Sequence, residues 1–233
     1  MDTIRLLVVS DVHSNITALE TVLDDAGDFD HLICVGDIVG YGPDPGECVE
    51  KLRGLGAKSV TGNHDLGVVT EGPPFQFNVN AAAAVNINRR LLTPGQLGWL
   101  RRLPKTLKFK IEGVNVSVFH GSPSQPVREY IFPSEARLRA SEFLEATGVD
   151  LLILGHTHIP FVHRFSGRFL TNPGAVGQPR DGDPRASYLT IDLTDGEITA
   201  KNHRVEYDIF VTEERMKAKG LPAGLYRRLH IGR

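Results

Sequence analysis

One short stretch near the start of the chain is Leu6-Leu7-Val8-Val9-Ser10-Asp11-Val12-His13-Ser14-Asn15. Its apolar half is typical of a buried β-strand, and a carboxylate and an imidazole follow it two residues apart. In an extended backbone alternate side chains share a face, so Asp11 and His13 would point the same way if the strand continued through them. Ser14 and Asn15 are helix N-cap types. The stretch therefore predicts a strand, a candidate pair of metal ligands and a helix, the order in which α/β enzymes place chemistry at a strand end.

Composition and charge narrow the class of protein. The chain has 233 residues, of which 41% are hydrophobic and 23% charged, as in an ordinary globular α/β protein. A formal net charge of -2 offers no field to hold a polyanion, so general nucleic-acid binding is not expected. The sequence lacks a signal peptide and any long apolar run, which predicts a cytoplasmic protein without a membrane partner. The oligomeric state stays open.

The only cysteines are Cys34 and Cys48, and they form no C-x-x-C motif. A disulfide and a thiolate zinc site are therefore not expected. Cys34 lies inside an apolar run, which predicts a core thiol.

Four further apolar runs, at 30–35, 58–61, 114–119 and 151–154, end in the same types of side chain. Each of these ends also contains a glycine, which allows a tight turn to bring side chains together. Five of the nine histidines lie at the strand ends, which makes coincidence a weak explanation. The five ends together carry Asp11 and His13, Asp37, Asn63 and His64, His120, and His156 and His158.

These side chains predict a site for two metal ions. Imidazoles, carboxylates and an amide oxygen are ligands that Mn, Fe or Zn accept. Two divalent ions beside only Asp11 and Asp37 leave a net charge of about +2, which a hydroxide and one phosphodiester charge would neutralise. Paired ions also clamp the attacking and leaving oxygens of a phosphate ester. We expect two divalent ions, manganese first with iron, zinc or nickel as alternatives, and a small phosphate-ester substrate, for which a nucleotide is one candidate.

His64 is predicted to act as a general acid rather than as a metal ligand. It adjoins Asn63 in a turn and can reach over the metals toward the leaving oxygen, which needs a proton. Asp65 has two interpretations. It could orient His64 as part of the catalytic machinery, although capping the next helix is the favoured role.

The rest of the chain predicts a helical segment followed by strands. Residues 66–104 read as helices and loops, which either cap the site or form a packing layer. Further strands are expected at 106–111, 114–119, 161–165, 169–171, 188–193 and 198–205, with a helix capped by Ser134 that ends near Gly148. The tail to Arg233 is predicted to be helical.

The motifs occur in a fixed order along the chain: Asp11-Val12-His13, Gly36-Asp37, Gly62-Asn63-His64-Asp65, His120-Gly121 and Gly155-His156-Thr157-His158. This set resembles the calcineurin-like metallophosphoesterase family, in particular its small bacterial and archaeal phosphodiesterases. Residues 172–180 extend the likeness to most of the chain. The motifs are highly specific as a set, although each alone is not.

The resemblance implies a single domain over residues 1–233. Its fold would be a four-layer α/β/β/α sandwich, with two mixed β-sheets face to face and helices outside. Asp37 would bridge the two metals, and His64 matches the catalytic histidine of the family. One metal would be held by Asp11, His13, Asp37 and His158, and the other by Asp37, Asn63, His120 and His156.

Two departures concern the substrate. The protein phosphatase branch carries a phosphate-binding arginine in an Asp-Arg-Gly segment after Gly-Asp, and it has Asn-His-Glu. The present chain has no arginine in 36–42 and has Asn63-His64-Asp65, which argues against a phosphoprotein substrate. Phosphate would then be met by the metals, by backbone N–H groups, or by Arg128 or Arg180, for which surface salt bridges are the alternative. Three aromatic residues could stack on a nucleobase, with core or lid packing as the alternative: Tyr41, Phe75 and Phe77.

The residues thus predict a metal-dependent phosphodiesterase in which a metal-bridging hydroxide attacks phosphorus in line and His64 protonates the leaving group. A phosphomonoesterase or a hydrolase of dinucleoside polyphosphates is the alternative enzyme. The alternative of another class is a non-catalytic scaffold of the same fold, such as the superfamily member in an endosomal sorting coat. Every predicted ligand position is filled here, which argues against the scaffold, whereas a large exposed apolar patch would favour it.

Overall fold

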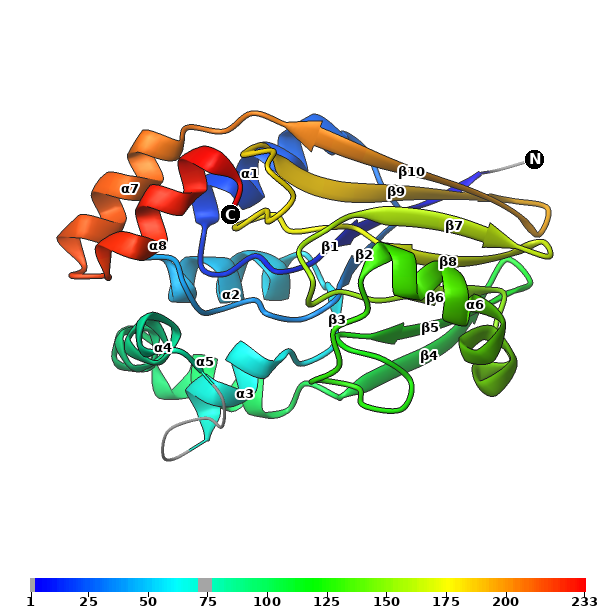
Figure 1. The fold of residues 1–233 in the computed structure, drawn as a ribbon, viewed down its shortest axis with the longest axis horizontal. Coiled ribbons are helices and arrows are strands. Elements are labelled where there is room, and N and C mark those ends of the chain that lie inside the picture. Colours follow the sequence, from blue (N-terminus) through cyan, green and yellow to red (C-terminus); the bar gives the residue numbers. More distant parts are fainter. Residues whose placement is uncertain (1–2, 71–76) are drawn as a thin grey trace.

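The computed structural model describes residues 3–70 and 77–233, and its framework is a pair of five-stranded β-sheets (Figure 1). The first sheet, in spatial order, contains β10 (Glu197–Val205), β9 (Ala186–Thr194), β1 (Ile4–Val9), β2 (His31–Cys34) and β3 (Lys58–Ser59). The second contains β4 (Thr106–Ile111), β5 (Val114–Phe119), β6 (Leu151–Ile153), β8 (Arg168–Asn172) and β7 (Phe161–Phe165).

Both sheets are mixed. β1 pairs with β2 in parallel and with β9 antiparallel, while β5, β6 and β8 form a parallel centre with antiparallel strands at both edges. Because the five strands that precede candidate ligands are all neighbours in their sheets, their carboxyl ends lie together. The predicted α/β class with two mixed sheets is confirmed.

The alternation of side chains along β1 sets the order of the layers. Leu6 and Val8 pack against Val116 and Ile153 of the second sheet, forming the core between the sheets. Leu7 and Val9 point the other way, into a core formed with α1 (Ile16–Ala26) and α2 (Pro45–Gly54). On the outer face of the second sheet lies α6 (Pro133–Thr147). These layers are the α/β/β/α sandwich that the resemblance implied.

Two groups of helices gather at one end of the molecule (Figure 1). The segment 66–104 contains most of α3 (Asn63–Val69), then α4 (Val79–Leu91) and α5 (Pro94–Arg101). The C-terminal part forms α7 (Ile209–Ala218), α8 (Ala223–Arg227) and the short 3-10 helix η1 (Arg228–Ile231), so the predicted helical tail is confirmed. A separate core joins the two groups: Tyr41, Ala81, Ala84, Met216, Leu221, Leu225 and Leu229.

The N-terminal boundary of α6 differs from the sequence prediction. α6 begins one residue before Ser134, because Pro133 takes the first helical position and Phe132 is the N-cap, so the predicted serine cap is wrong. Its end at Gly148 in the left-handed conformation is confirmed. Asp44 is the N-cap residue of α2, but its side chain makes no capping hydrogen bond and instead pairs with Arg215 of α7 at 2.8 Å.

Cys34 and Cys48 are both fully buried free thiols, and Cys34 packs in the core as predicted. Among residues 3–70 and 77–233, no helix combines the length and the apolar character needed to cross a membrane.

Candidate metal centre

The candidate ligands lie in the loops that follow β1, β2, β3, β5 and β6, and the backbone turns sharply at several of them. Asp11, His13 and Asp37 have φ values of 51°, 48° and 52°, and His156 and His158 have 69° and 60°. The expectation that Asp11 and His13 continue an extended strand is therefore wrong. A left-handed backbone conformation costs on the order of 1–3 kcal/mol for each non-glycine residue that adopts it. Such residues cluster at functional sites, where the turn directs several side chains toward a common point.

The first group of side chains comprises Asp11, His13 and His158, all buried. Oδ1 of Asp11 lies 3.3 Å from Nε2 of His158 and 3.8 Å from Nε2 of His13. The two imidazole Nε2 atoms are themselves 3.2 Å apart. Their ligand atoms all lie within 4.8 Å of one another, close enough to share one ion.

The second group comprises Asp37, His120 and His156. Nε2 of His120 lies 3.5 Å from Oδ2 of Asp37, 3.1 Å from Nδ1 of His156 and 3.2 Å from Oδ1 of Asn63. Oδ2 of Asp37 is also 3.7 Å from Nε2 of His13, so this one oxygen lies between the two groups. Asp37 is the residue to which the resemblance assigned the bridging position.

Each carboxylate divides its oxygens between the protein and the centre. Oδ2 of Asp11 accepts hydrogen bonds from the Ser10 hydroxyl at 2.6 Å and the His156 backbone N–H at 3.2 Å. Oδ1 of Asp11 is buried and has no hydrogen-bond partner among the described residues. Oδ1 of Asp37 accepts from the His64 backbone N–H at 2.8 Å, which leaves Oδ2 facing the centre. A buried carboxylate oxygen without a donor is costly, and a cation would satisfy it.

The imidazoles are oriented by backbone carbonyls on their outer sides. Nδ1 of His13 lies 3.2 Å from the Val39 carbonyl, and Nδ1 of His120 lies 2.8 Å from the Val35 carbonyl. A carbonyl can only accept, so these outer nitrogens carry the protons and the inner nitrogens present lone pairs. The carbonyls of Gln178 and Arg128 face the outer nitrogens of His158 and His156 in the same way. Lone pairs that face one another at about 3 Å suit a shared cation, and the donor set fits divalent metals.

Burial and mutual charge set the ionisation of the imidazoles. Burial lowers the pKa of His156 to about 3 and also lowers the pKa values of His13 and His158. At His120 burial acts in the same direction, but the Asp37 carboxylate outweighs it and raises the pKa of His120 to about 9. Three imidazoles are thus neutral at pH 7, which is the form that binds metal.

The two carboxylates stay ionised. Although burial works against it, His158 lowers the pKa of Asp11, and His120 lowers the pKa of Asp37 in the same way. The site therefore offers two buried carboxylates beside three neutral imidazoles.

His64 lies at the edge of this centre and is buried. Its ring is close enough to His13 and Asp37 for the three ligand atoms to fall within 4.8 Å. It packs against Tyr41 at 4.4 Å and Phe77 at 4.5 Å between ring centroids, and its Nδ1 has no hydrogen-bond partner among the described residues. Burial lowers its pKa to about 4.

Asp65 is held by the backbone. Its Oδ2 accepts from the Gly62 N–H at 2.9 Å and its Oδ1 from the Val39 N–H at 3.1 Å. This is the helix-capping geometry that the sequence favoured, at the start of α3. Burial, reinforced by the Asp37 charge, raises the pKa of Asp65 to about 7. Both carboxylate oxygens are thus engaged with the two loops that carry Asp37 and His64.

Gly62 and Gly40 allow these loops to approach one another. A Cβ at Gly62 would lie 2.0 Å from Oδ1 of Asp37. A Cβ at Gly40, where φ is +136°, would lie 2.6 Å from Nδ1 of His13 and 2.7 Å from Nδ1 of His64. The site has no room for a side chain at either position.

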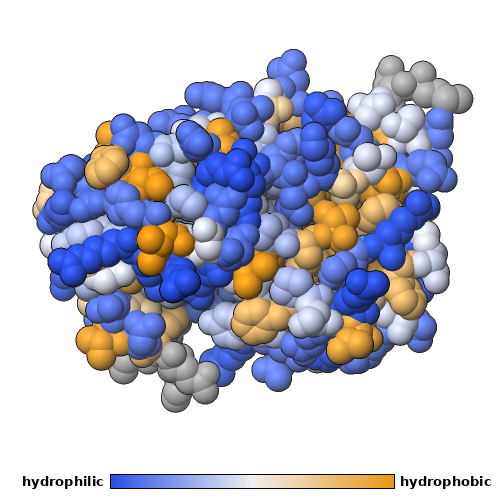
Figure 2. Space-filling model, turned by 45° about the horizontal axis from the view of Figure 1, so that its top comes forward, coloured by the Kyte–Doolittle hydropathy of each residue, from blue (hydrophilic) through white to orange (hydrophobic). Residues whose placement is uncertain are grey.

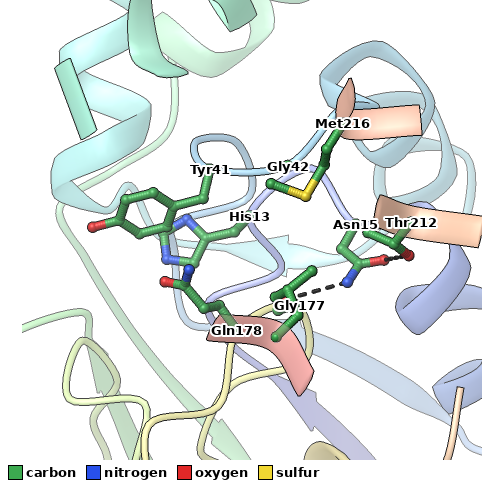
Figure 3. A pocket seen from close by; sticks show the side chains of 9 residues that line it. His13, Asn15, Tyr41, Gly42, Gly177, Gln178, Thr212 and Met216 are labelled. Carbon is green, nitrogen blue, oxygen red and sulfur yellow. Dashed lines mark hydrogen bonds between the residues drawn. The ribbon is translucent and has the colours of Figure 1, made fainter. Parts of the chain in front are cut away.

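A small pocket lies behind His13, on the side of α7 (Figure 3). Asn15 donates a hydrogen bond to the Gly177 carbonyl at 3.2 Å and accepts one from the Thr212 hydroxyl at 3.0 Å. Its Oδ1 also caps α1, as the sequence predicted for Ser14 or Asn15. These bonds fasten the turn that carries His13 to α7 and to the loop of Gly177.

The residues predicted to bind substrate do not all lie at the same cavity. Tyr41 and Arg180 line a cavity of about 330 Å³ that opens beside Asn63 and His64. The side chain of Arg128 is exposed and does not line this cavity, so its contribution is the backbone carbonyl that contacts His156. Phe75 lies outside the described residues.

Segment 66–104 contributes both to the cavity and to packing. Phe77, Asn78 and Ala81 line the cavity, while Leu92 and Leu100 pack in the core over α2. The buried Asn88 of α4 was not singled out from the sequence, yet it accepts from the Ser14 hydroxyl at 2.6 Å and the Gly40 N–H at 2.7 Å. Asn88 is one of three asparagines in this alanine-rich helix, so its residue type carries no sequence signal for this contact.

Comparisons with known proteins agree with this geometry. The model of the calcineurin-like phosphoesterase superfamily domain matches residues 4–196. The chain is 38% identical to the uncharacterized protein MJ0912 of Methanocaldococcus jannaschii over 246 residues, which cover 98% of each chain. The crystal structure of a metallophosphoesterase from Sphaerobacter thermophilus is 40% identical, with a TM-score of 0.86 over 100% of both chains. Phosphodiesterase YfcE of Escherichia coli K12 is 25% identical over 201 residues, covering 81% of this chain and 87% of the relative. The chain therefore belongs to the calcineurin-like phosphoesterase superfamily.

Proposed function

We propose that this metallophosphoesterase is a dinuclear metal-dependent phosphodiesterase. One observation carries the proposal: Oδ2 of Asp37 lies between two buried groups of metal-ligand atoms, 3.7 Å from Nε2 of His13 and 3.5 Å from Nε2 of His120. His64 adjoins both that carboxylate and an open cavity. A buried pair of sites beside a cavity suits a reaction in which both the attacking and the leaving oxygen need charge stabilisation.

The ligands would be divided as the resemblance implies, with Asp37 common to both metals. The first ion would take Asp11, His13 and His158, and the second Asn63, His120 and His156. When bound, two divalent ions would activate a water molecule and neutralise charge on the phosphate. Manganese is the ion we would test first, with iron, zinc and nickel as alternatives.

His64 is proposed as the general acid. Its ring lines the cavity beside Asn63, where a substrate would extend from the centre. An anionic phosphate next to the imidazole favours the protonated form and so opposes the effect of burial. The proton would pass from the ring nitrogen to the oxygen of the departing alcohol as the phosphorus–oxygen bond breaks. Asp65 would act indirectly, by holding the loops of Gly62 and Val39.

Two considerations favour a diester over a monoester. With two divalent ions and two carboxylates the centre carries a net charge of about +2, which a hydroxide and a singly charged diester balance. The Escherichia coli relative, which is 25% identical, is named a phosphodiesterase. A monoester or a dinucleoside polyphosphate is the alternative substrate that the experiment below separates.

A non-catalytic scaffold would be expected to present a broad apolar surface for its partners. On the face drawn in Figure 2, hydrophobic residues occur in small groups separated by hydrophilic ones. That distribution supports the enzyme over the scaffold for this face of the molecule.

The experiment is hydrolysis of bis(p-nitrophenyl) phosphate and p-nitrophenyl phosphate by metal-stripped protein, with Mn, Fe, Zn, Ni or Mg added back one at a time. We expect metal-dependent cleavage with kcat/KM higher for the diester. A higher value for the monoester would replace the diesterase with a monoesterase. Absence of turnover with every metal, while the protein still binds two ions, would contradict an enzyme acting on either ester.

Two variants test whether the activity depends on the candidate metal centre. Asp37→Asn should abolish activity, because it removes the negative charge of the carboxylate that lies between both groups of ligands. His31→Gln, at the start of β2, changes a histidine outside the centre and should keep full activity.

A further inference from the structure

The cavity beside His64 is lined by basic and aromatic side chains. Its volume of about 330 Å³ is within the range of small-molecule sites. Asn63 and His64 also line it, so the cavity adjoins the candidate metal centre. The remaining basic and aromatic lining residues are Tyr41, Phe77, Tyr130, Arg180, Arg228 and Arg233.

Tyr41 holds two of these arginines in place. The guanidinium carbon of Arg228 lies 4.5 Å from the centroid of the Tyr41 ring, and that of Arg180 lies 5.6 Å from it. A terminal nitrogen of Arg180 also donates to the Tyr41 hydroxyl at 3.1 Å and to Oε1 of Gln178 at 3.2 Å. The tyrosine thus positions two like charges on one wall of the cavity, through contacts that leave both guanidinium charges uncompensated.

Neither guanidinium has a carboxylate partner in the part of the chain that the structure describes. Nε of Arg180, and Nε and one terminal nitrogen of Arg228, are buried without a hydrogen-bond acceptor there. Arg139, by contrast, forms ion pairs with carboxylates, those of Glu129, Glu135 and Glu142. Burial, and then the positive charge of Arg180, lower the pKa of Arg228.

Two adjacent, partly buried cations without an anion are unfavourable in the free protein. A phosphate group matches them, because its oxygens accept paired hydrogen bonds from the guanidinium fork. Both arginines lie outside the groups of metal ligands, in a cavity that begins at His64.

We infer that Arg180 and Arg228 form a second phosphate-binding site, which selects phosphoesters whose leaving group carries a phosphate of its own. The position on the leaving-group side rests on the proposed function, because it follows from the role of His64 as the general acid. The scissile phosphate would lie at the metal centre, and the second phosphate would bind Arg180 and Arg228 on the wall that Tyr41 forms beside His64.

The first test measures binding without catalysis. Inorganic phosphate is titrated into metal-stripped protein by isothermal titration calorimetry. We expect one site that Arg228→Gln and Arg180→Gln each weaken by about tenfold or more, as the loss of a charge-assisted contact predicts. Arg228→Lys, which keeps the charge and loses the fork, should weaken it less. The control Arg90→Gln removes an exposed charge on α4 and should leave binding unchanged.

The second test uses metal-loaded protein and three dinucleotides: TpT, pTpT and TpTp. Only cleavage of the internucleotide bond is counted. We expect kcat/KM to be about tenfold or more higher for one of the two phosphorylated forms than for TpT, and we expect Arg228→Gln to remove that preference while Arg90→Gln retains it.

The two tests separate the inference from the proposed function. Arginine-dependent phosphate binding by a protein that hydrolyses no ester would support the second site and contradict the proposed phosphodiesterase. Diester hydrolysis with equal rates on TpT, pTpT and TpTp, together with phosphate binding that Arg180→Gln and Arg228→Gln leave unchanged, would overturn the second site and leave the phosphodiesterase standing.

Discussion

The backbone N–H of His64 donates a hydrogen bond of 2.8 Å to Oδ1 of Asp37. This bond fixes the proposed general acid to the carboxylate that lies between both groups of metal ligands. The two oxygens of Asp37 therefore differ in role, because Oδ1 binds the His64 loop and Oδ2 faces the imidazoles. Changes in that loop should therefore alter metal binding as well as proton transfer.

Gly62→Ala tests this coupling. The new Cβ would lie 2.0 Å from Oδ1 and 2.4 Å from the backbone nitrogen of Asp37, so the carboxylate must move. We expect metal content to fall, diester hydrolysis to drop by more than about 100-fold, and the free energy of unfolding to decrease by about 1–3 kcal/mol, as for overpacked sites. Metal analysis, kinetics and urea denaturation measure these effects.

Gly54→Ala is the matched control. A Cβ at Gly54, in the last turn of α2, meets no atom within 4 Å, so this variant should bind metal normally. It should also unfold at equal or slightly higher urea concentration, because alanine favours the helix. Equal behaviour of the two alanine variants would contradict the account of the Gly62 loop.

His64→Ala separates proton donation from metal binding. We expect two bound ions to remain, and kcat for bis(p-nitrophenyl) phosphate to fall by about 10²–10⁴-fold, the range for a lost general acid. The loss should be larger for a diester with an alkyl leaving group, which needs the proton more. A variant that loses one ion would show that His64 is a ligand instead.

Asn88→Ala should reveal how strongly α4 is anchored to the site. The asparagine is fully buried, accepts from Ser14 and Gly40, and donates to the Gly42 carbonyl at 3.0 Å. Removing it leaves buried polar groups unpaired, at a cost of about 1–3 kcal/mol for each group. We expect a lower denaturation midpoint together with reduced activity. Asn86→Ala, exposed on the same helix, should match the wild type in both measurements.

Asp44 should make stability depend on pH. Burial, opposed in part by Arg215, raises the pKa of the Asp44 carboxyl from 3.8 to about 6. The folded state therefore binds this proton more tightly than the unfolded state, and the resulting stabilisation, present below about pH 4, is lost as the pH rises through about 6. Asp44→Asn should remove the part of the pH dependence of the unfolding free energy that this carboxyl contributes.

The measurement is urea denaturation of wild type and Asp44→Asn at intervals from pH 4 to pH 7. The free-energy difference, wild type minus variant, should become more negative as the pH rises. A constant difference across that range would rule out a shifted pKa at Asp44. Asp24→Asn, an exposed carboxylate on α1, serves as the control.

Much of the fold was predictable because hydrophobic runs and ligand types coincide. The run before Asp11 is apolar on both faces, which indicates a central strand covered on both sides, and β1 is such a strand. Asp195-Gly196, with φ values of 51° and 82°, has the residue types typical of a tight hairpin turn and joins β9 to β10.

Local conformation at the site was less predictable. The extended geometry expected for Asp11 and His13 failed because hydrogen bonds from their backbone N–H groups to Gly36 and Asp37 carbonyls stabilise left-handed turns. Those partners lie in another strand end, so no local pattern reports them.

Only one residue of the arginine pair was predicted from the sequence as a candidate for phosphate binding. Arg180, which ends the family-like stretch 172–180, was a candidate phosphate-binding residue, whereas Arg228 comes from the C-terminal helical region. It reaches Tyr41 only because Leu225 and Leu229 pack with Ala81 and Ala84 of α4. Such placement depends on tertiary packing between segments far apart in the chain, and residue types alone do not encode it.

The most direct test of the central claim is a titration of metal-stripped protein with Mn²⁺ while hydrolysis of bis(p-nitrophenyl) phosphate is followed. The account predicts no cleavage without metal and a rate that rises to a plateau at two equivalents per chain, with no rate at any equivalence for Asp37→Asn. A rate that is full without added metal, or one that stays at background after two ions have bound, would contradict it.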